Sequence, residues 1–186
     1  MEHMPATRIT WRDVLEMPED GNRYEAIGGE LYVSPPPRPR HEWVSMNLVD
    51  ALLPLLVHPG HGRLFTAPVG VEFPDGDEGA QPDILFLATA RLAIVTDDAI
   101  RGAPDLVIEI LSPGTARRDR TVKRHLYRRH GVAEYWIADP DAKQIEVWDF
   151  SREAAEPVRY LDRVPVRVGR RTIGTLELAT IFDWPR

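Results

Sequence analysis

The sequence predicts an α/β (α+β) fold, in which a mixed sheet is flanked by helices, with an N-terminal hairpin and extra C-terminal strands. Three observations lead to this. Asp105–Leu111 is an almost wholly apolar run between two prolines, typical of a strand covered on both faces. From His41, apolar residues recur at intervals of three and four, as on one face of a helix. Two strand-like runs, Arg23–Ile27 and Glu30–Ser34, flank Gly28-Gly29, which is a hairpin signal.

The N-terminal part should hold a short helix, the hairpin and a longer helix. Thr10 is a typical N-cap for a helix that begins at Trp11 and ends before the next proline. The segment Pro35–Arg40 is too rich in proline for a regular element and predicts an extended connector with exposed arginines. The helix from His41 should end near a Pro-Gly pair, with a kink at Pro54.

The rest of the chain should alternate strands with one further long helix. Arg117–His130 has a helical pattern and is followed by Gly131, a residue that commonly ends helices. The apolar run Asp105–Leu111 should be the central strand. The remaining expected elements are strands at 63–67, 69–73 and 82–87, an acidic loop at 74–79, a short helical segment at 88–95, a hairpin of 133–138 with 144–150, and short strands after residue 157.

Length and composition favour one domain over residues 1–186, because the chain has 186 residues with 43% hydrophobic content. It has no cysteine, which excludes a disulfide framework, a zinc ribbon and a thiol nucleophile. A cytoplasmic location is expected. The N-terminus lacks the apolar core of a signal peptide, and no run is long enough to span a membrane.

The charge of the chain is acidic overall but locally basic. A formal net charge of −6 gives no global attraction to DNA. However, Arg117–Arg129 holds seven Lys or Arg residues against one Asp. A local basic patch decides nucleic-acid binding more than the total charge does.

Asp83 and Glu109 are the strongest candidates for a functional site. Each is a carboxylate within an apolar run, where an ionised acid is costly unless it is paired or binds a metal. Carboxylates are the ligands that Mg²⁺ and Mn²⁺ prefer. The alternative is that Asp83 caps a strand entry and Glu109 forms a structural ion pair.

Lys123 is the third candidate. On a helical wheel of about 100° per residue it lies between the sheet-facing side and the exposed side, so it could reach toward a site at the sheet edge. The alternative is a surface pair with Asp119, four residues earlier. The wheel also aligns four arginines in one stripe that could contact phosphates or simply be a solvated face: Arg117, Arg120, Arg124 and Arg128.

The other candidates are weaker. Glu25 lies on the hairpin, where a charged residue usually faces solvent. The histidines form no metal-binding motif, and the chain has no nucleophile elbow, P-loop or dinucleotide fingerprint, so no nucleotide cofactor is expected.

The chain resembles the Uma family (Uma two) of restriction endonucleases, within the PD-(D/E)xK nuclease superfamily. The similarity covers nearly the whole sequence. It is carried by Tyr24–Leu31, Pro82-Asp83, Ala103–Pro113, Asp119, Lys123, Tyr127 and Gly131–Pro140.

The resemblance implies a restriction-endonuclease-like fold and a divalent-metal-dependent endonuclease that hydrolyses phosphodiester bonds of DNA. Asp83 and Glu109 would hold Mg²⁺ or Mn²⁺, Lys123 would activate or orient water, and Glu25 would be an accessory acid beneath the site. We further expect the Ile110 carbonyl to be a third protein ligand of the metal. The superfamily's usual lysine falls two residues after the acid, where this chain has Leu111. The alternative function is therefore an inactive nuclease-fold module that binds nucleic acid or a protein partner. A homodimer is expected by analogy, because cutting both strands is simplest with two sites.

Overall fold

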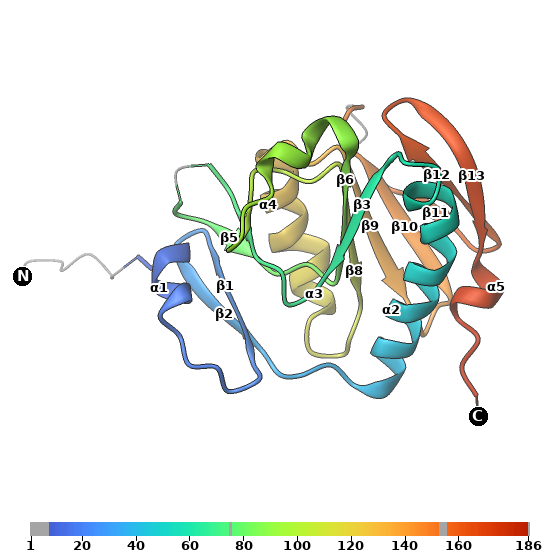
Figure 1. Cartoon of the computed structure of the whole chain (residues 1–186). Helices are drawn as coiled ribbons and strands as arrows, with labels where there is room; N and C mark the ends of the chain where they lie inside the picture. Colours follow the sequence, from blue (N-terminus) through green and yellow to red (C-terminus); the bar gives the residue numbers. More distant parts are fainter. Residues whose placement is uncertain (1–7, 75, 153–155, 186) are drawn as a thin grey trace, which may run out of the picture.

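The core of the molecule is a mixed sheet in which the Glu109 strand is central. The computed structural model describes residues 8–74, 76–152 and 156–185 (Figure 1). Within them, a six-stranded sheet has the order β11-β10-β9-β8-β6-β3. Strand β8 pairs antiparallel with β6 and parallel with β9, so the predicted fold class and the central strand are confirmed. The strands are β3 (Gly62–Thr66), β6 (Ile84–Ala88), β8 (Leu106–Ile110), β9 (Glu134–Asp139), β10 (Gln144–Asp149) and β11 (Val158–Tyr160).

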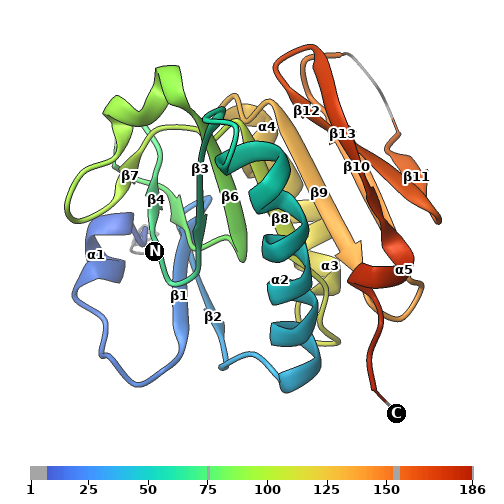
Figure 2. The same ribbon diagram turned by 45° about the vertical axis from the view of Figure 1, so that its right-hand side comes forward.

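Helices cover both faces of this sheet, as the apolar strands require. Side chains of β8 alternate between two hydrophobic clusters, because successive strand residues point to opposite faces. Ile108 packs with helix α2 (Pro39–Leu52), whereas Val107 packs with helix α4 (Arg124–Arg129). Figures 1 and 2 show α2 on one side of the sheet and α4 on the other.

A second sheet carries the N-terminal hairpin. Its order is β2-β1-β5-β4-β7 within the described residues, and helix α1 (Trp11–Leu15) packs beside β1. Gly28 and Gly29 both have positive φ, as a tight hairpin turn requires, which confirms the predicted β1–β2 hairpin. The strands are β1 (Arg23–Ile27), β2 (Glu30–Ser34), β4 (Val71–Glu72), β5 (Gly79–Ala80) and β7 (Ile100–Arg101).

The C-terminal segment forms the extra strands that the sequence predicts. Strands β12 (Arg163–Val168) and β13 (Arg171–Glu177) pair antiparallel and lead into helix α5 (Leu178–Ile181). Their buried side chains belong to the same hydrophobic cluster as those of α2. Helix α5, which follows this hairpin, packs against α2.

Several predicted boundaries were wrong. Helix α2 begins at Pro39, a favoured first helical position, so Arg40 belongs to the helix and is only partly exposed. Both long helices also change pitch. Helix α2 continues as the π-helical turn η1 (Leu53–Val57), and the predicted helix 117–130 is α3 (Ala116–Arg118), the π-helical turn η3 (Asp119–Lys123) and α4. The segment expected to be weakly helical is a 3₁₀ helix, η2 (Thr89–Ile94), and the strand expected at 69–73 is reduced to β4.

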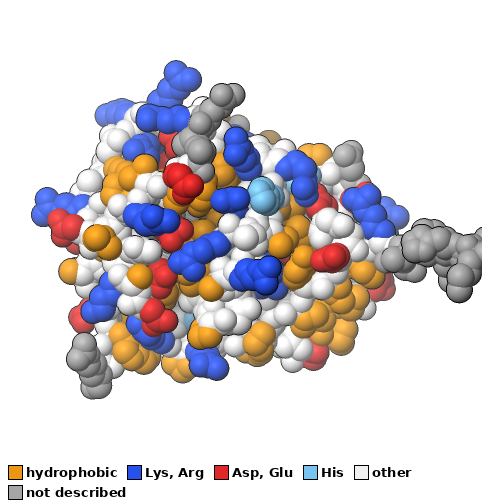
Figure 3. All heavy atoms as spheres, turned by 180° about the vertical axis from the view of Figure 1, so that it is seen from behind, with side chains coloured by type: hydrophobic (Ala, Val, Ile, Leu, Met, Phe, Trp, Pro, Cys, Tyr) orange, Lys and Arg blue, Asp and Glu red, His pale blue; other side chains and the backbone are white. Residues whose placement is uncertain are grey.

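Charges of both signs are mixed on the surface. On the face opposite that of Figure 1, Lys and Arg side chains alternate with acidic and apolar ones (Figure 3). The described part of the chain contains no helix long and apolar enough to cross a membrane.

The packing of β3 against β6 makes Gly62 a test of the fold. A Cβ at Gly62 would lie 2.0 Å from the Leu87 carbonyl oxygen, which is backbone and cannot move aside. We expect Gly62→Ala to lower the free energy of unfolding by about 1–3 kcal/mol, measured by urea denaturation. Gly114→Ala is the control, because a Cβ there meets nothing within 4 Å. Equal stability of the two variants would contradict this packing.

Candidate active site

Antiparallel pairing brings Asp83 and Glu109 together although 26 positions separate them. In the β6–β8 register, Ile84 lies opposite Ile108. Continued by one residue, this register places Asp83 opposite Glu109, on the α4 face of the sheet. The two residues are 5% and 3% exposed. The predicted pair of acids therefore lies at one buried point, where the hairpin, the central sheet and the helix of Lys123 meet.

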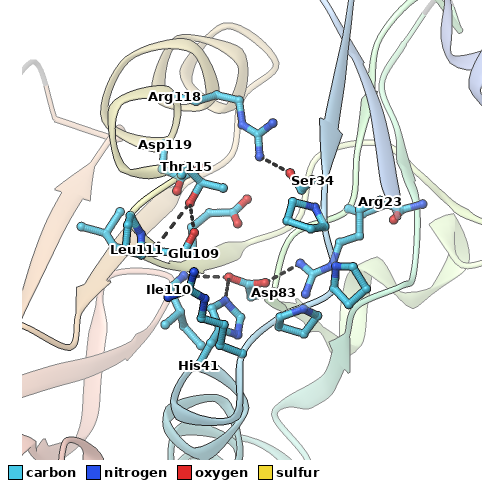
Figure 4. Close-up of a pocket in the computed structure, with 18 of the residues that line it drawn as sticks. Arg23, Ser34, His41, Asp83, Glu109, Ile110, Leu111, Thr115, Arg118 and Asp119 are labelled. Atoms are coloured by element: carbon cyan, nitrogen blue, oxygen red, sulfur yellow. Dashed lines mark hydrogen bonds and ion pairs between the residues drawn. The ribbon is translucent and has the colours of Figure 1, made fainter. Parts of the chain in front are cut away.

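Asp83 is held by three donors (Figure 4). Its Oδ1 accepts a hydrogen bond from Arg23 Nη1 at 2.5 Å, and its Oδ2 lies 3.0 Å from His41 Nε2 and 2.8 Å from the Ile110 backbone nitrogen. Burial alone would raise the pKa of Asp83, but His41 and Arg23 outweigh it and hold the pKa well below its usual range. Asp83 is therefore an ionised carboxylate.

Lys123 lies between two acids. Its Nζ donates to Glu109 Oε1 at 2.8 Å and forms an ion pair with Glu25 Oε1 at 2.9 Å. Lys123 is only 3% exposed, so the wheel position at the border was wrong. Burial lowers the pKa of Lys123, but Glu109 and Glu25 raise it by more, and the ammonium stays charged. Its ion-pair partners among the described residues are these two acids and not Asp119.

Glu25 is buried beneath the site. Its Oε1 accepts a hydrogen bond from the Gln81 backbone nitrogen at 2.9 Å, and its Oε2 lies 3.7 Å from Arg118. With 1% exposure, it does not face solvent, so the pattern-based expectation for this hairpin residue was wrong. The family resemblance placed it correctly beneath the site, whereas its role as an accessory acid stays a prediction.

Glu109 has one oxygen committed and one free. Its Oε1 accepts from Lys123 and, at 2.6 Å, from the Tyr127 hydroxyl. Among the described residues, no hydrogen bond to Oε2 is found. Burial raises the pKa of Glu109 to about 8, although the Lys123 charge opposes this shift.

These groups line a cavity of about 390 Å³, which we call the active-site cleft. The proline connector Pro35–Arg38 lines it together with the loop Ser112–Thr115. Arg40 also lines it, bonded to the Asp141 carboxylate at 2.6 Å and to the Pro140 carbonyl at 2.5 Å. The cleft therefore holds both acids and cations.

The chemistry of the cleft fits a hard divalent cation. Two carboxylates on adjacent strands are the usual protein share of such a site, which water and substrate oxygens complete. A buried oxygen of Asp119, Oδ1, also lines the cleft without a hydrogen-bond partner in the described structure. In that same part of the chain, no three His, Asp or Glu side chains already form a metal-ligating cluster. The ligands would have to be completed from outside the protein.

A family model described as "Uma2: Putative restriction endonuclease" matches residues 11–180. The chain belongs to the Uma2 family. A solved structure described as a putative nuclease belonging to DUF820 from Anabaena variabilis shares the fold, with a TM-score of 0.74 and 24% sequence identity. That similarity covers 94% of this chain and 97% of the other. No match is found among curated proteins.

The four arginines predicted as a phosphate-binding stripe are not equivalent in this Uma2 chain. Arg120 is bonded to Asp139 at 2.9 Å and to Glu146 at 3.3 Å, and Arg124 lies 4.6 Å over the Trp148 ring. Arg117 and Arg128 are exposed. Two of the four are therefore committed to the protein, and DNA contact by the stripe stays a prediction.

Sequence reasoning missed four residues of the site. Arg23, His41 and Arg118 line the cleft, and Tyr127 donates to Glu109. The Uma2 resemblance included Tyr127 but gave it no role. The other three come from three separate elements, so no local spacing indicated that they would meet.

We expect the pKa of His41 to depend on its contact with Asp83. Burial lowers the pKa of His41, but the hydrogen bond and charge of Asp83 raise it above the usual value. The stability from this pair is thus present below the unfolded pKa of 6.5 and lost as pH rises through the folded pKa. We expect Asp83→Asn to lower the His41 pKa, measured by NMR titration of its ring.

Asp141→Asn is the matched control, because it removes an exposed carboxylate that pairs with Arg40 and not with His41. An unchanged His41 pKa in Asp83→Asn would contradict the pairing.

Proposed function

We propose that this chain is an endonuclease that hydrolyses phosphodiester bonds of DNA and depends on Mg²⁺ or Mn²⁺. The observation that carries the proposal is the convergence of Asp83, Glu109 and Lys123 in one cleft. The fold and the family support a nuclease.

The proposed ion would be held by Asp83, by the free Oε2 of Glu109 and by the Ile110 carbonyl. When bound, it would polarise the scissile phosphate and lower the pKa of the attacking water. Lys123 fixes Glu109 through Oε1, which keeps the other oxygen available. In hydrolysis, the water oxygen bonds to phosphorus and gives up a proton to solvent as the bond between phosphorus and the leaving oxygen breaks, and solvent supplies a proton to that oxygen.

Arginines of the cleft would position the phosphate. The hydrogen bonds of the Arg118 guanidinium are only partly satisfied. Its Nη2 donates to Ser34 at 2.5 Å, whereas its Nε has no acceptor among the described residues. Arg23 lines the same cleft and donates to Asp83. A guanidinium has the fixed donor geometry that phosphate oxygens require.

One observation favours the second candidate, a nuclease-fold module that binds nucleic acid or a protein without cutting. Both oxygens of Asp83 already accept hydrogen bonds from the protein, so a cation must compete with Arg23 and His41. Failure of Mn²⁺ to bind the wild-type protein in calorimetry would favour this module over the nuclease. A homodimer stays a prediction for either function.

The first test is nicking of supercoiled plasmid. We expect nicking with Mg²⁺ or Mn²⁺, abolition by EDTA, and a loss of at least about a hundredfold in Glu109→Gln and Lys123→Gln. Glu146→Gln is the control, because Glu146 is a comparably buried acid that lies outside the cleft lining and pairs with Arg120. Activity that survives EDTA or either site substitution would sink the mechanism, provided that circular dichroism shows the variants folded.

The second test is the pH dependence of metal binding. The pKa of Glu109 is raised to about 8, so below that pH a cation must displace a proton from this carboxyl. We expect Mn²⁺ affinity, measured by calorimetry, to rise by up to about tenfold per pH unit until pH 8 is passed, with proton release. Glu109→Gln should bind Mn²⁺ more weakly and without this rise. A flat affinity across neutral pH in the wild type would contradict ligation by Glu109.

A further inference from the structure

Asp83 lies at the junction of two cavities. The active-site cleft adjoins a second cavity of about 660 Å³, the α1–α2 pocket, which is lined by residues of α1, of the segment before β1 and of α2. Arg23, His41 and Asp83 line both cavities. A polymeric substrate that passes Asp83 would therefore find space on either side of this residue.

Apolar side chains form much of the walls of both cavities, and charged groups lie at the junction, in the cleft interior and, as Glu19 and Glu42, in the α1–α2 pocket. Pro35, Pro36 and Pro37 form an exposed wall of the cleft. Leu15 and Met46 are large apolar side chains of the α1–α2 pocket that are exposed, at 64% and 56%. Sites with apolar walls and a few convergent polar groups bind ligands that combine a flat apolar body with polar edges. A nucleotide has this character, with a charged phosphate beside an apolar base face.

We propose that the substrate of this site is single-stranded DNA, with unpaired nucleotides held in the cleft and in the α1–α2 pocket on either side of the scissile phosphate. In a duplex the base faces are stacked on one another, and the protein meets only the backbone and the groove edges. Apolar walls next to the catalytic acids would then have nothing to contact. In a single strand each base face is free to pack against them.

The charge distribution supports the same substrate. Duplex binding without a base-reading motif depends on many phosphate contacts from a basic surface. This chain has a net charge of −6, and two arginines of its most basic segment, Arg120 and Arg124, are committed to protein groups. Within the cleft, Arg23 and Arg118 each lie beside an acid, Asp83 and Glu25 respectively. These two arginines suit the backbone of a single DNA strand better than the two backbones of a duplex.

This inference rests on the proposed nuclease function, and the first experiment separates the two. One labelled oligonucleotide is incubated with Mn²⁺ either alone or annealed to its complement. We expect the single strand to be cut at least about tenfold faster. Cleavage of the duplex at an equal or higher rate would overturn the inference and leave the nuclease standing. Cleavage of neither form would count against the nuclease itself.

The second experiment tests the α1–α2 pocket. Leu15→Ser and Met46→Ser remove exposed apolar side chains, so the fold should tolerate them. We expect each to raise KM for the single strand by about three- to tenfold with kcat unchanged. Leu161→Ser is the matched control, because Leu161 is 72% exposed and lines neither cavity. Pocket variants that match this control would overturn the inference.

A binding measurement gives a readout that does not need activity. Fluorescence anisotropy in EDTA should show that the uncut single strand binds more tightly than the duplex, and that Met46→Ser weakens this binding. Equal binding of the two forms would contradict the proposal.

Discussion

The ammonium of Lys123 between Glu25 and Glu109 is the contact on which the site depends. It joins the N-terminal hairpin, the central strand and the helical segment after it, all at a point closed to solvent. Buried charges persist only when they are paired, and loss of one partner of such a pair costs about 3–5 kcal/mol. The same lysine therefore fixes the relative positions of three elements and leaves one oxygen of Glu109 for a ligand.

The position of Lys123 explains how an ammonium reaches Glu109 although the residue two positions after this acid is Leu111. Residues two apart on a strand share a face, so Glu109 and Leu111 both point toward α4. A lysine at position 111 could approach the acid from the strand itself, whereas here Leu111 packs in the apolar cluster and the ammonium comes from η3. The π-helical turn carries an extra residue, which the regular wheel could not anticipate. The wheel therefore placed Lys123 at a border when it lies in the core.

The parts of the structure that could be predicted from the sequence are those that short, local residue patterns determine. Gly28-Gly29 specified the hairpin, and the apolar run around Glu109 specified a strand buried on both faces. The partners of the acids were not predictable, because Arg23 opens the hairpin and His41 lies in the first turns of α2. Each is an ordinary residue in its local context. Only the antiparallel pairing of β6 with β8, and the packing of the hairpin against them, brings these residues to Asp83.

The protein cations that neutralise Asp83 also bear on how a substrate would enter. In the described structure Arg23 and His41 compensate a carboxylate that burial would otherwise protonate. A bound cation would take over that compensation, and Arg23 would then be free to meet the negative charge of a phosphate in the same cleft. Cation and phosphate would thus enter as a pair with little change in buried net charge. Since each isolated buried charge is costly, this exchange favours joint over separate binding.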